Sequence, residues 1–289
     1  MKRVAFLLGS LLASGCSTGT TPSGQPSPKS PSPSSSTERA VTPAAPRGGA
    51  LLYRPTPGAL YALERRDSLT LELPGGGTQL QEFARTAYLT IGIAEASGGY
   101  QASIRLDSLR QEPGGTGSII APDSMLRAEG TTWTGSLTTQ GRLGELRADR
   151  SSGVADQVGA SLSVLFPVLP ATGLQDGAAW SDTAERTIRT DAFDTKERAT
   201  TSYRVVKVDN KVYTIDAATG FQRTGTAGQA AQPMEMASQG TRKSTYRFGA
   251  DGVVLGAEGA DSAEMTITVQ AVGQTVPVHQ RARWKISKK

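Results

Sequence analysis

The chain has 289 residues, one cysteine, one histidine and a formal net charge of +5 at pH 7. These counts exclude a zinc site of the usual ligands, and they exclude Ser-His-Asp or Cys-His catalysis unless the single histidine serves. The modest charge does not argue for nucleic acid, and no EF-hand spacing, phosphate loop or dinucleotide fingerprint occurs.

Residues 1–15 contain the three parts of a secretory signal peptide. Lys2 and Arg3 are basic, residues 4–12 are apolar, and small residues follow up to Gly15. A bilayer core requires about 20 apolar residues, so this stretch is too short for a permanent transmembrane anchor. We therefore expect cleavage before residue 16.

Cys16 follows the small residues directly, and the segment Leu12-Ala13-Ser14-Gly15-Cys16 resembles a bacterial lipobox, with Ala13 where leucine is commoner. The resemblance implies a diacylglycerol on the sulfur of Cys16 and an acylated new N-terminus, which together form a stable membrane anchor. Lipidation would also remove the only thiol from an oxidising compartment. The alternative is ordinary secretion with an incidental cysteine.

Residues 16–48 follow as a linker rich in Pro, Ser, Thr and Gly, almost without large apolar side chains. Such a composition predicts disorder, because too little surface can be buried to offset the entropy of ordering. The linker would average about 30 Å end to end and reach about 90 Å as extended polyproline II. A Pro-x-x-Pro ligand for an aromatic groove is the weaker interpretation.

Residues 49–289 show an apolar period of two, which predicts a single antiparallel β domain. Apolar side chains alternate with polar ones in residues 59–73, again in residues 83–93 and 100–106, and in the last hairpin, residues 265–286. We expect a large, strongly curved open sheet or half-barrel of about ten or eleven strands. Arg65 and Asp67 interrupt the apolar face of the first strand, which indicates a bulge or a polar position lining a cavity.

One helix is predicted near residues 151–165. Ser151 or Ser152 can cap it, and Val158 and Leu162 belong to an apolar stripe with helical spacing. Residues 113–130, rich in Gly and Pro, are expected to form a loop. Asp209-Asn210 is a turn pair between two strands.

The charged residues offer only weak candidates for chemistry. His279 alternates with apolar neighbours and should face solvent or a polar cavity wall. The basic positions nearby could meet anionic lipid headgroups, although a solvated strand face is the simpler interpretation; they are Arg281, Arg283, Lys285, Lys288 and Lys289, with Arg242 and Lys243.

Two sets of carboxylates could in principle act as the acid and base of a hydrolase, if they lie roughly 5 to 9.5 Å apart. One set is Asp191 and Asp194, and the other is Glu145, Asp149 and Asp156. They cluster near predicted turns and helix ends, where acids commonly cap and solvate, so we expect no enzyme.

Over roughly residues 50–289, the chain resembles uncharacterised bacterial lipoproteins in which a Leu-Pro stretch precedes a Gly-x-x-Trp strand start, here Leu169-Pro170 and Gly177 to Trp180. The expected architecture also resembles the lipoprotein-carrier half-barrels, in which an open antiparallel sheet curves around a helix and holds acyl chains. This second resemblance concerns the fold and transfers no site residues.

The sequence therefore leads to two functional hypotheses for a lipoprotein of the cell envelope, at the outer membrane facing the periplasm or at the cell surface. The first is a binding module with an apolar cleft for a lipid or other hydrophobic ligand, for which Trp133, Trp180 and Trp284 are candidate liners. The second is a structural lipoprotein that binds another envelope protein. Neither requires a cofactor or a metal.

Overall fold

The computed structural model describes residues 53, 58–73, 75–112, 121–189, 194–227 and 233–289. Cys16, the signal peptide, the linker and Asp191 lie outside these residues. The described part is mainly β and forms one open antiparallel sheet of eleven strands that does not close into a barrel, as the alternation of apolar residues predicted.

The strands of this sheet are long and joined mainly by short turns. In chain order they are β1 (Ala59–Leu73), β2 (Gly77–Ala96), β3 (Gly99–Gln111), β4 (Thr132–Leu137), β5 (Arg147–Ala148), β6 (Ala179–Arg189), β7 (Asp194–Asp209), β8 (Val212–Thr226), β9 (Met234–Gly249), β10 (Val254–Val269) and β11 (Gln274–Lys288).

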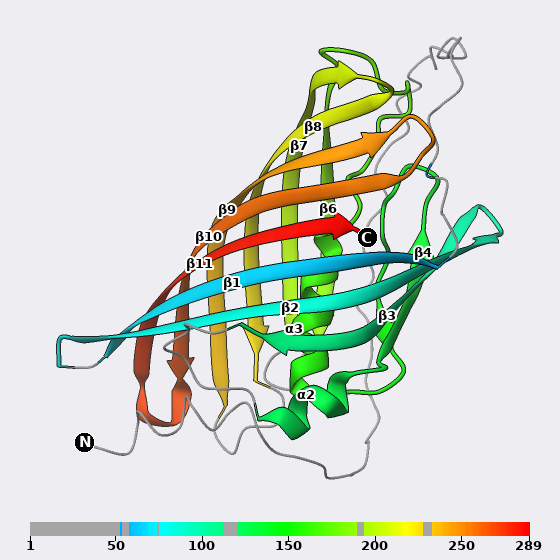
Figure 1. The fold of residues 1–289 in the computed structure, drawn as a ribbon. Coiled ribbons are helices and arrows are strands. Elements are labelled where there is room, and N and C mark those ends of the chain that lie inside the picture. The colour runs from blue at the N-terminus through cyan, green and yellow to red at the C-terminus, as the bar shows by residue number, and fades with distance from the viewer. Residues whose placement is uncertain (1–52, 54–57, 74, 113–120, 190–193, 228–232) are drawn as a thin grey trace, which may run out of the picture.

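The sheet order is β5-β4-β3-β2-β1-β11-β10-β9-β8-β7-β6. Strands that follow one another in sequence thus pair, except β5 and β6, and β1 pairs with β11 from Tyr61 opposite Lys288 to Leu71 opposite Val278. The break in the sheet falls between β5 and β6. The sheet curls around the helix α3 (Gly153–Ser161), with β4 and β6 on either side of it (Figure 1).

Helix α3 lies within the predicted range and continues as a 3-10 turn, η1 (Leu162–Val164). The Ser152 hydroxyl caps it by accepting a hydrogen bond from the Ala155 amide at 3.2 Å. Val158 and Leu162 are fully buried in the main core, as the apolar stripe predicted. Gly159, which disfavours a helix by its propensity, allows close packing here: a Cβ atom would lie 2.7 Å from Nε1 of Trp133.

A second helix, α2 (Pro122–Ala128), lies within the segment that we expected to be a loop. Its proline occupies the first turn, where the missing N–H costs no helical hydrogen bond. A second 3-10 turn, η2 (Gln270–Val272), follows β10. None of these described helices has the length and apolar character required to cross a bilayer.

The turn between β7 and β8 forms where the sequence predicted it, with a small shift. Asn210 and Lys211 connect β7 and β8 with φ of 47° and 64°, one residue later than the predicted pair. Arg65 and Asp67 cause no bulge, because β1 keeps a continuous register with both neighbours. Their inward-pointing charges are instead accommodated by ion pairing, described below.

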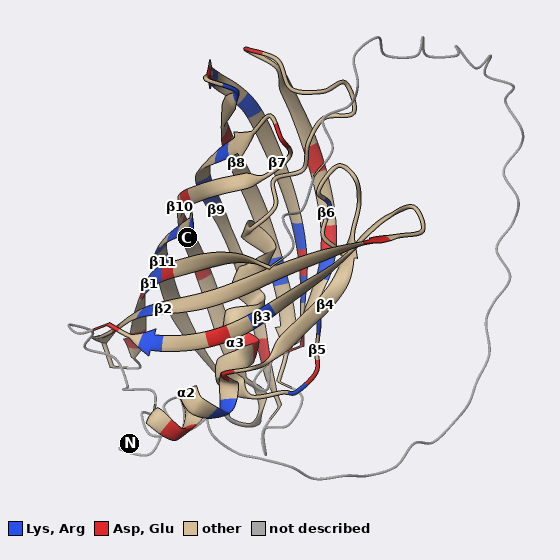
Figure 2. Ribbon diagram, turned by 45° about the vertical axis from the view of Figure 1, so that its right-hand side comes forward, with Lys and Arg blue, Asp and Glu red and all other residues tan. Residues whose placement is uncertain are grey.

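The inner face of the sheet has three zones. The main apolar core lies against α3 and η1, and a smaller apolar cluster of Leu71, Met234, Ile267, Val276 and Val278 lies toward the β10–β11 turn. Charged side chains from β1 and β6–β10 interrupt the apolar face between these clusters. Basic and acidic positions are interspersed along the strands (Figure 2).

Candidate functional site

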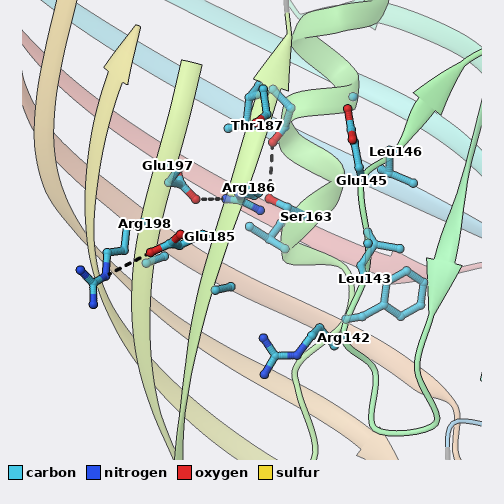
Figure 3. A pocket seen from close by; sticks show the side chains of 18 of the residues that line it. Arg142, Leu143, Glu145, Leu146, Ser163, Glu185, Arg186, Thr187, Glu197 and Arg198 are labelled. Carbon is cyan, nitrogen blue, oxygen red and sulfur yellow. Dashed lines mark hydrogen bonds and ion pairs between the residues drawn. The ribbon is translucent and has the colours of Figure 1, made fainter. Parts of the chain in front are cut away.

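A cleft of about 1110 Å³ lies where the two edges of the sheet face each other. One wall comes from β4, β5 and the segment between them. The other wall comes from β6 and the inner faces of β7, β8 and β9, while α3 and η1 lie between the walls. Figure 3 shows Leu143 and Leu146 on one side, Arg186 and Glu197 on the other, and Ser163 of η1 between them.

The apolar part of the lining is formed mainly by the β4 side and the helix. Trp133 of β4 is only 3% exposed and packs beside Gly159 of α3. Leu143 and Leu146 continue this wall, and Val164 and Phe166 extend it after α3. The apolar lining residues therefore come from β4, the segment after it and η1.

The opposite wall contains a buried ion cluster. Arg186 of β6, Glu197 of β7 and Arg223 of β8 are direct partners in the strand register. Because alternate residues of a strand point to the same face, all three side chains project inward. The Glu197 carboxylate, which is 1% exposed, accepts a hydrogen bond at Oε2 from Nε of Arg223 and forms an ion pair through Oε1 with Arg186.

A second set of ion pairs adjoins this cluster on the same face. Arg242 of β9 donates from Nε to Oδ1 of Asp261 on β10 at 2.8 Å. Arg65 pairs with Asp67 at 2.7 Å, and the Trp284 indole donates to Asp261 at 3.3 Å. Arg65 also lies 3.8 Å from Asp261, so in this set two guanidinium groups are balanced by two carboxylates.

Burial alone would raise the pKa of Glu197, but Arg186 and Arg223 outweigh it and hold the pKa below its usual value. In the same way, burial opposes ionisation of Asp261, while Arg242, Arg65 and the Trp284 indole together hold its pKa below the usual value. Both acids are therefore ionised at neutral pH, and their charges are committed to the arginines.

A contact bridges the two edges of the sheet near the cleft. Arg142, in the segment after β4, pairs with Asp182 of β6 and donates to the Thr183 carbonyl at 3.2 Å. Since this carbonyl belongs to the edge strand, Arg142 satisfies a group that β6 cannot pair within the sheet.

The three tryptophans that the sequence suggested as cleft liners lie in different places. Only Trp133 is among the residues that line the cleft. Trp180 stacks on Tyr203 at 5.3 Å and donates from its indole to the Val168 carbonyl at 2.7 Å. Trp284 is buried beneath the ion pairs at Asp261. The lining is also more polar than the apolar cleft that we expected.

The candidate carboxylates differ in their surroundings. Glu145 and Asp156 line the cleft, whereas Asp149 accepts a hydrogen bond from the Thr132 amide at 3.0 Å, and Asp194 is exposed at the start of β7. Within the described ranges, no group of three or more His, Cys, Asp or Glu side chains is arranged to hold a metal ion.

His279 lies on the outer face, where its Nε2 is 3.1 Å from Oε1 of Glu72. Arg281, Arg283 and Lys285 of β11 share this face, but acids flank some of them: Lys285 lies between Glu64 and Glu258 in the register. Arg242 does not belong to this surface, since it points inward while Lys243 is exposed. These contacts agree with a solvated strand face.

Sequence reasoning did not single out Arg186, Glu197 and Arg223. They could have been found from strand parity. Each lies two positions from another inward residue of its strand, namely Ala184, Ala199 or Phe221, and therefore points to the same face. The inward positions of β6–β8 carry many small and hydroxyl side chains, so the apolar period that revealed β1–β3 is weak there.

A comparison with known protein families gives no match. A search of curated proteins likewise finds no sequence of significant similarity. The functional inference therefore depends on the site itself.

Proposed function

We propose that this chain is a membrane-anchored envelope lipoprotein whose β domain binds a lipid or another hydrophobic ligand in the cleft between the sheet edges. The observation that carries the proposal is the cleft itself. Its volume of about 1110 Å³ matches the upper end of small-molecule sites, which occupy roughly 300–1,000 Å³. The apolar lining residues Trp133, Leu143 and Leu146 give an alkyl chain a surface to cover.

Binding, rather than hydrolysis, is the activity that the ionised groups favour. A general acid needs a proton at neutral pH, which requires a raised pKa. The most buried carboxylate of the cleft, Glu197, has a lowered pKa and two arginine partners. This group is therefore better suited to organising charge than to transferring a proton.

Filling the cleft tests the proposal. In Ala184→Trp, the indole would occupy space at a lining position on β6, and we expect binding of the neutral probe N-phenyl-1-naphthylamine to fall at least tenfold. The matched control is Ala218→Trp, on the exposed outer face of β8, which should bind as the parent does. Native mass spectrometry of protein purified from its own membrane would show a co-purifying ligand. Failure of the parent to bind the probe or carry a ligand would contradict the proposal.

The anchor has its own test. Cys16→Ala removes the sulfur that lipidation requires, and we expect the protein to move from the membrane pellet to the soluble fraction and to lose incorporation of radiolabelled palmitate. Ser17→Ala is the control and should leave both unchanged. Palmitate incorporation that persists in Cys16→Ala would exclude this cysteine as the lipidated residue.

A structural role with a protein partner is the second candidate, and one feature favours it. Strand β6 has eleven residues and pairs on one side only, with β7. An edge strand of this length can accept a strand from another protein. A mature protein that carries no ligand and binds no hydrophobic probe would favour this candidate over the first.

A further inference from the structure

Charges are unevenly distributed between the buried ion cluster and the second set of ion pairs beside it. Arg65 is matched by Asp67 and Arg242 by Asp261, but Arg186 and Arg223 share the single carboxylate of Glu197. Of these side chains, Arg186 and Arg223 therefore carry one positive charge that no carboxylate balances. Both line the cleft, whereas Arg65, Asp67 and Asp261 do not.

The rest of the described lining does not reverse this surplus. Counted together with Arg186, Arg223 and Glu197, the lining contains seven Lys and Arg side chains and five Asp and Glu side chains. Two of those acids, Asp182 and Glu185, already have partners in Arg142 and Arg198. The cleft is therefore positive overall, and the deepest part of that charge lies on β6 and β8.

Arg186 also has an unused donor. Its Nε is buried and meets no acceptor among the described residues. Burial lowers the pKa of Arg186, and Glu197 only partly restores it. A buried N–H without an acceptor costs free energy that an added oxygen would recover. A guanidinium offers several donors in a planar fork, which suits the oxygens of a carboxylate or a phosphate.

The apolar wall lies across the cleft from this arginine pair, as Figure 3 shows for Leu143 and Leu146 opposite Arg186. A ligand that satisfies both walls needs an anionic oxygen group at one end and an aliphatic chain at the other. A neutral hydrocarbon would leave the surplus charge and the Nε donor unsatisfied, and a small anion would leave the apolar wall exposed to water.

We propose that the ligand of the cleft is an oxyanion-headed amphiphile, whose carboxylate or phosphate is held by Arg186 and Arg223 while its aliphatic chain lies along the wall of Trp133, Leu143 and Leu146. This inference rests on the proposed binding function and narrows its ligand class. Glu197 holds the two guanidinium groups in place from behind and does not contact the ligand.

Paired ligands test the proposal on the full mature chain carrying Cys16→Ala, which can be purified without detergent. Oleate and oleyl alcohol share one chain and differ in the charged head, and their affinities at pH 8 are measured by displacement of N-phenyl-1-naphthylamine. We expect oleate to bind at least tenfold more tightly. Oleoyl lysophosphatidic acid, with a phosphate head, should share that preference. Acetate and inorganic phosphate should compete only at millimolar concentrations.

Two substitutions locate the head. Arg186→Gln should weaken oleate at least tenfold and oleyl alcohol less than twofold, whereas Arg186→Lys, which keeps the charge, should retain most of the preference. Arg281→Gln, on the exposed outer face, is the control and should leave both affinities unchanged.

The outcomes separate the two proposals. Equal affinities of the parent for oleate and oleyl alcohol would overturn the oxyanion inference and leave the binding function intact. Strong competition by inorganic phosphate alone would also overturn it, because the site would then bind small anions. Binding of neither oleate nor oleyl alcohol would reject the binding function itself. These parent measurements decide the matter even if Arg186→Gln fails to fold.

Discussion

Glu197→Gln is expected to lower the free energy of unfolding by about 3 to 5 kcal/mol, the range for breaking a buried ion pair from one side. The substitution removes the only carboxylate that Arg186 and Arg223 share, and it leaves two guanidinium groups facing each other in a largely buried position. Urea denaturation at pH 7 measures the loss.

Glu185→Gln is the matched control, because Glu185 pairs with Arg198 at 3.7 Å on the exposed side of the neighbouring strand. Both partners are more than 70% exposed, so solvent screens the pair, and its loss should cost about 0 to 1 kcal/mol. Equal losses in the two variants would show that the Glu197 cluster is no more important for stability than a surface pair.

The same cluster predicts how stability depends on pH. Since the arginines hold the pKa of Glu197 below that of an unfolded glutamate, about 4.3, the folded state binds fewer protons than the unfolded state in this range. The contribution of Glu197 is therefore fully present above about pH 5 and is lost as the pH falls through its folded pKa. The parent and Glu197→Gln should thus converge in stability on acidification; parallel curves would contradict this origin of the effect.

Gly141→Ala is expected to cost about 3 kcal/mol or more, through strain and overpacking together. Gly141 has a φ of 89°, and an added Cβ would lie 2.1 Å from Cε2 of Tyr53 and 2.8 Å from the Pro167 carbonyl. Tyr53 cannot move easily, since its hydroxyl donates to Pro167 and its ring packs edge-on against Phe166 and Phe248.

Gly76→Ala separates the two causes. Gly76 has nearly the same φ, 86°, but a Cβ there would meet nothing within 4 Å. This control should cost only the backbone strain, about 1 to 2 kcal/mol. Thermal and urea denaturation of both variants give the comparison, and a Gly141→Ala loss no larger than that of Gly76→Ala would rule out the close approach to Tyr53 as the cause.

Several strands and one helix could be predicted from the sequence, because each depends on the pattern of residues within its own segment. The strands β1–β3 and the β10–β11 hairpin show a clear apolar period, and α3 has both a serine cap and an apolar stripe. Helix α2 was missed because its seven residues follow a Gly- and Pro-rich run and are too few to show a helical period.

The site could be predicted only in part. Arg65 and Asp67 drew attention because they interrupt a strongly apolar face, whereas Arg186 and Glu197 lie in strands whose inward positions are already polar. Arg242 was placed with its neighbour Lys243, although adjacent residues of a strand point to opposite faces. The partner that decides each case lies on another strand, and sequence alone does not give that register.

The pairing of β1 with β11 also governs the order in which the domain can assemble. It is the only strand pairing that joins β1–β5 to β6–β11, and it brings together Tyr61 and Lys288. Each half can form by local hairpins, but this junction must wait until the last strand has been synthesised, and contacts so distant in sequence form slowly. The complete eleven-stranded sheet can therefore form only after β11 has left the ribosome.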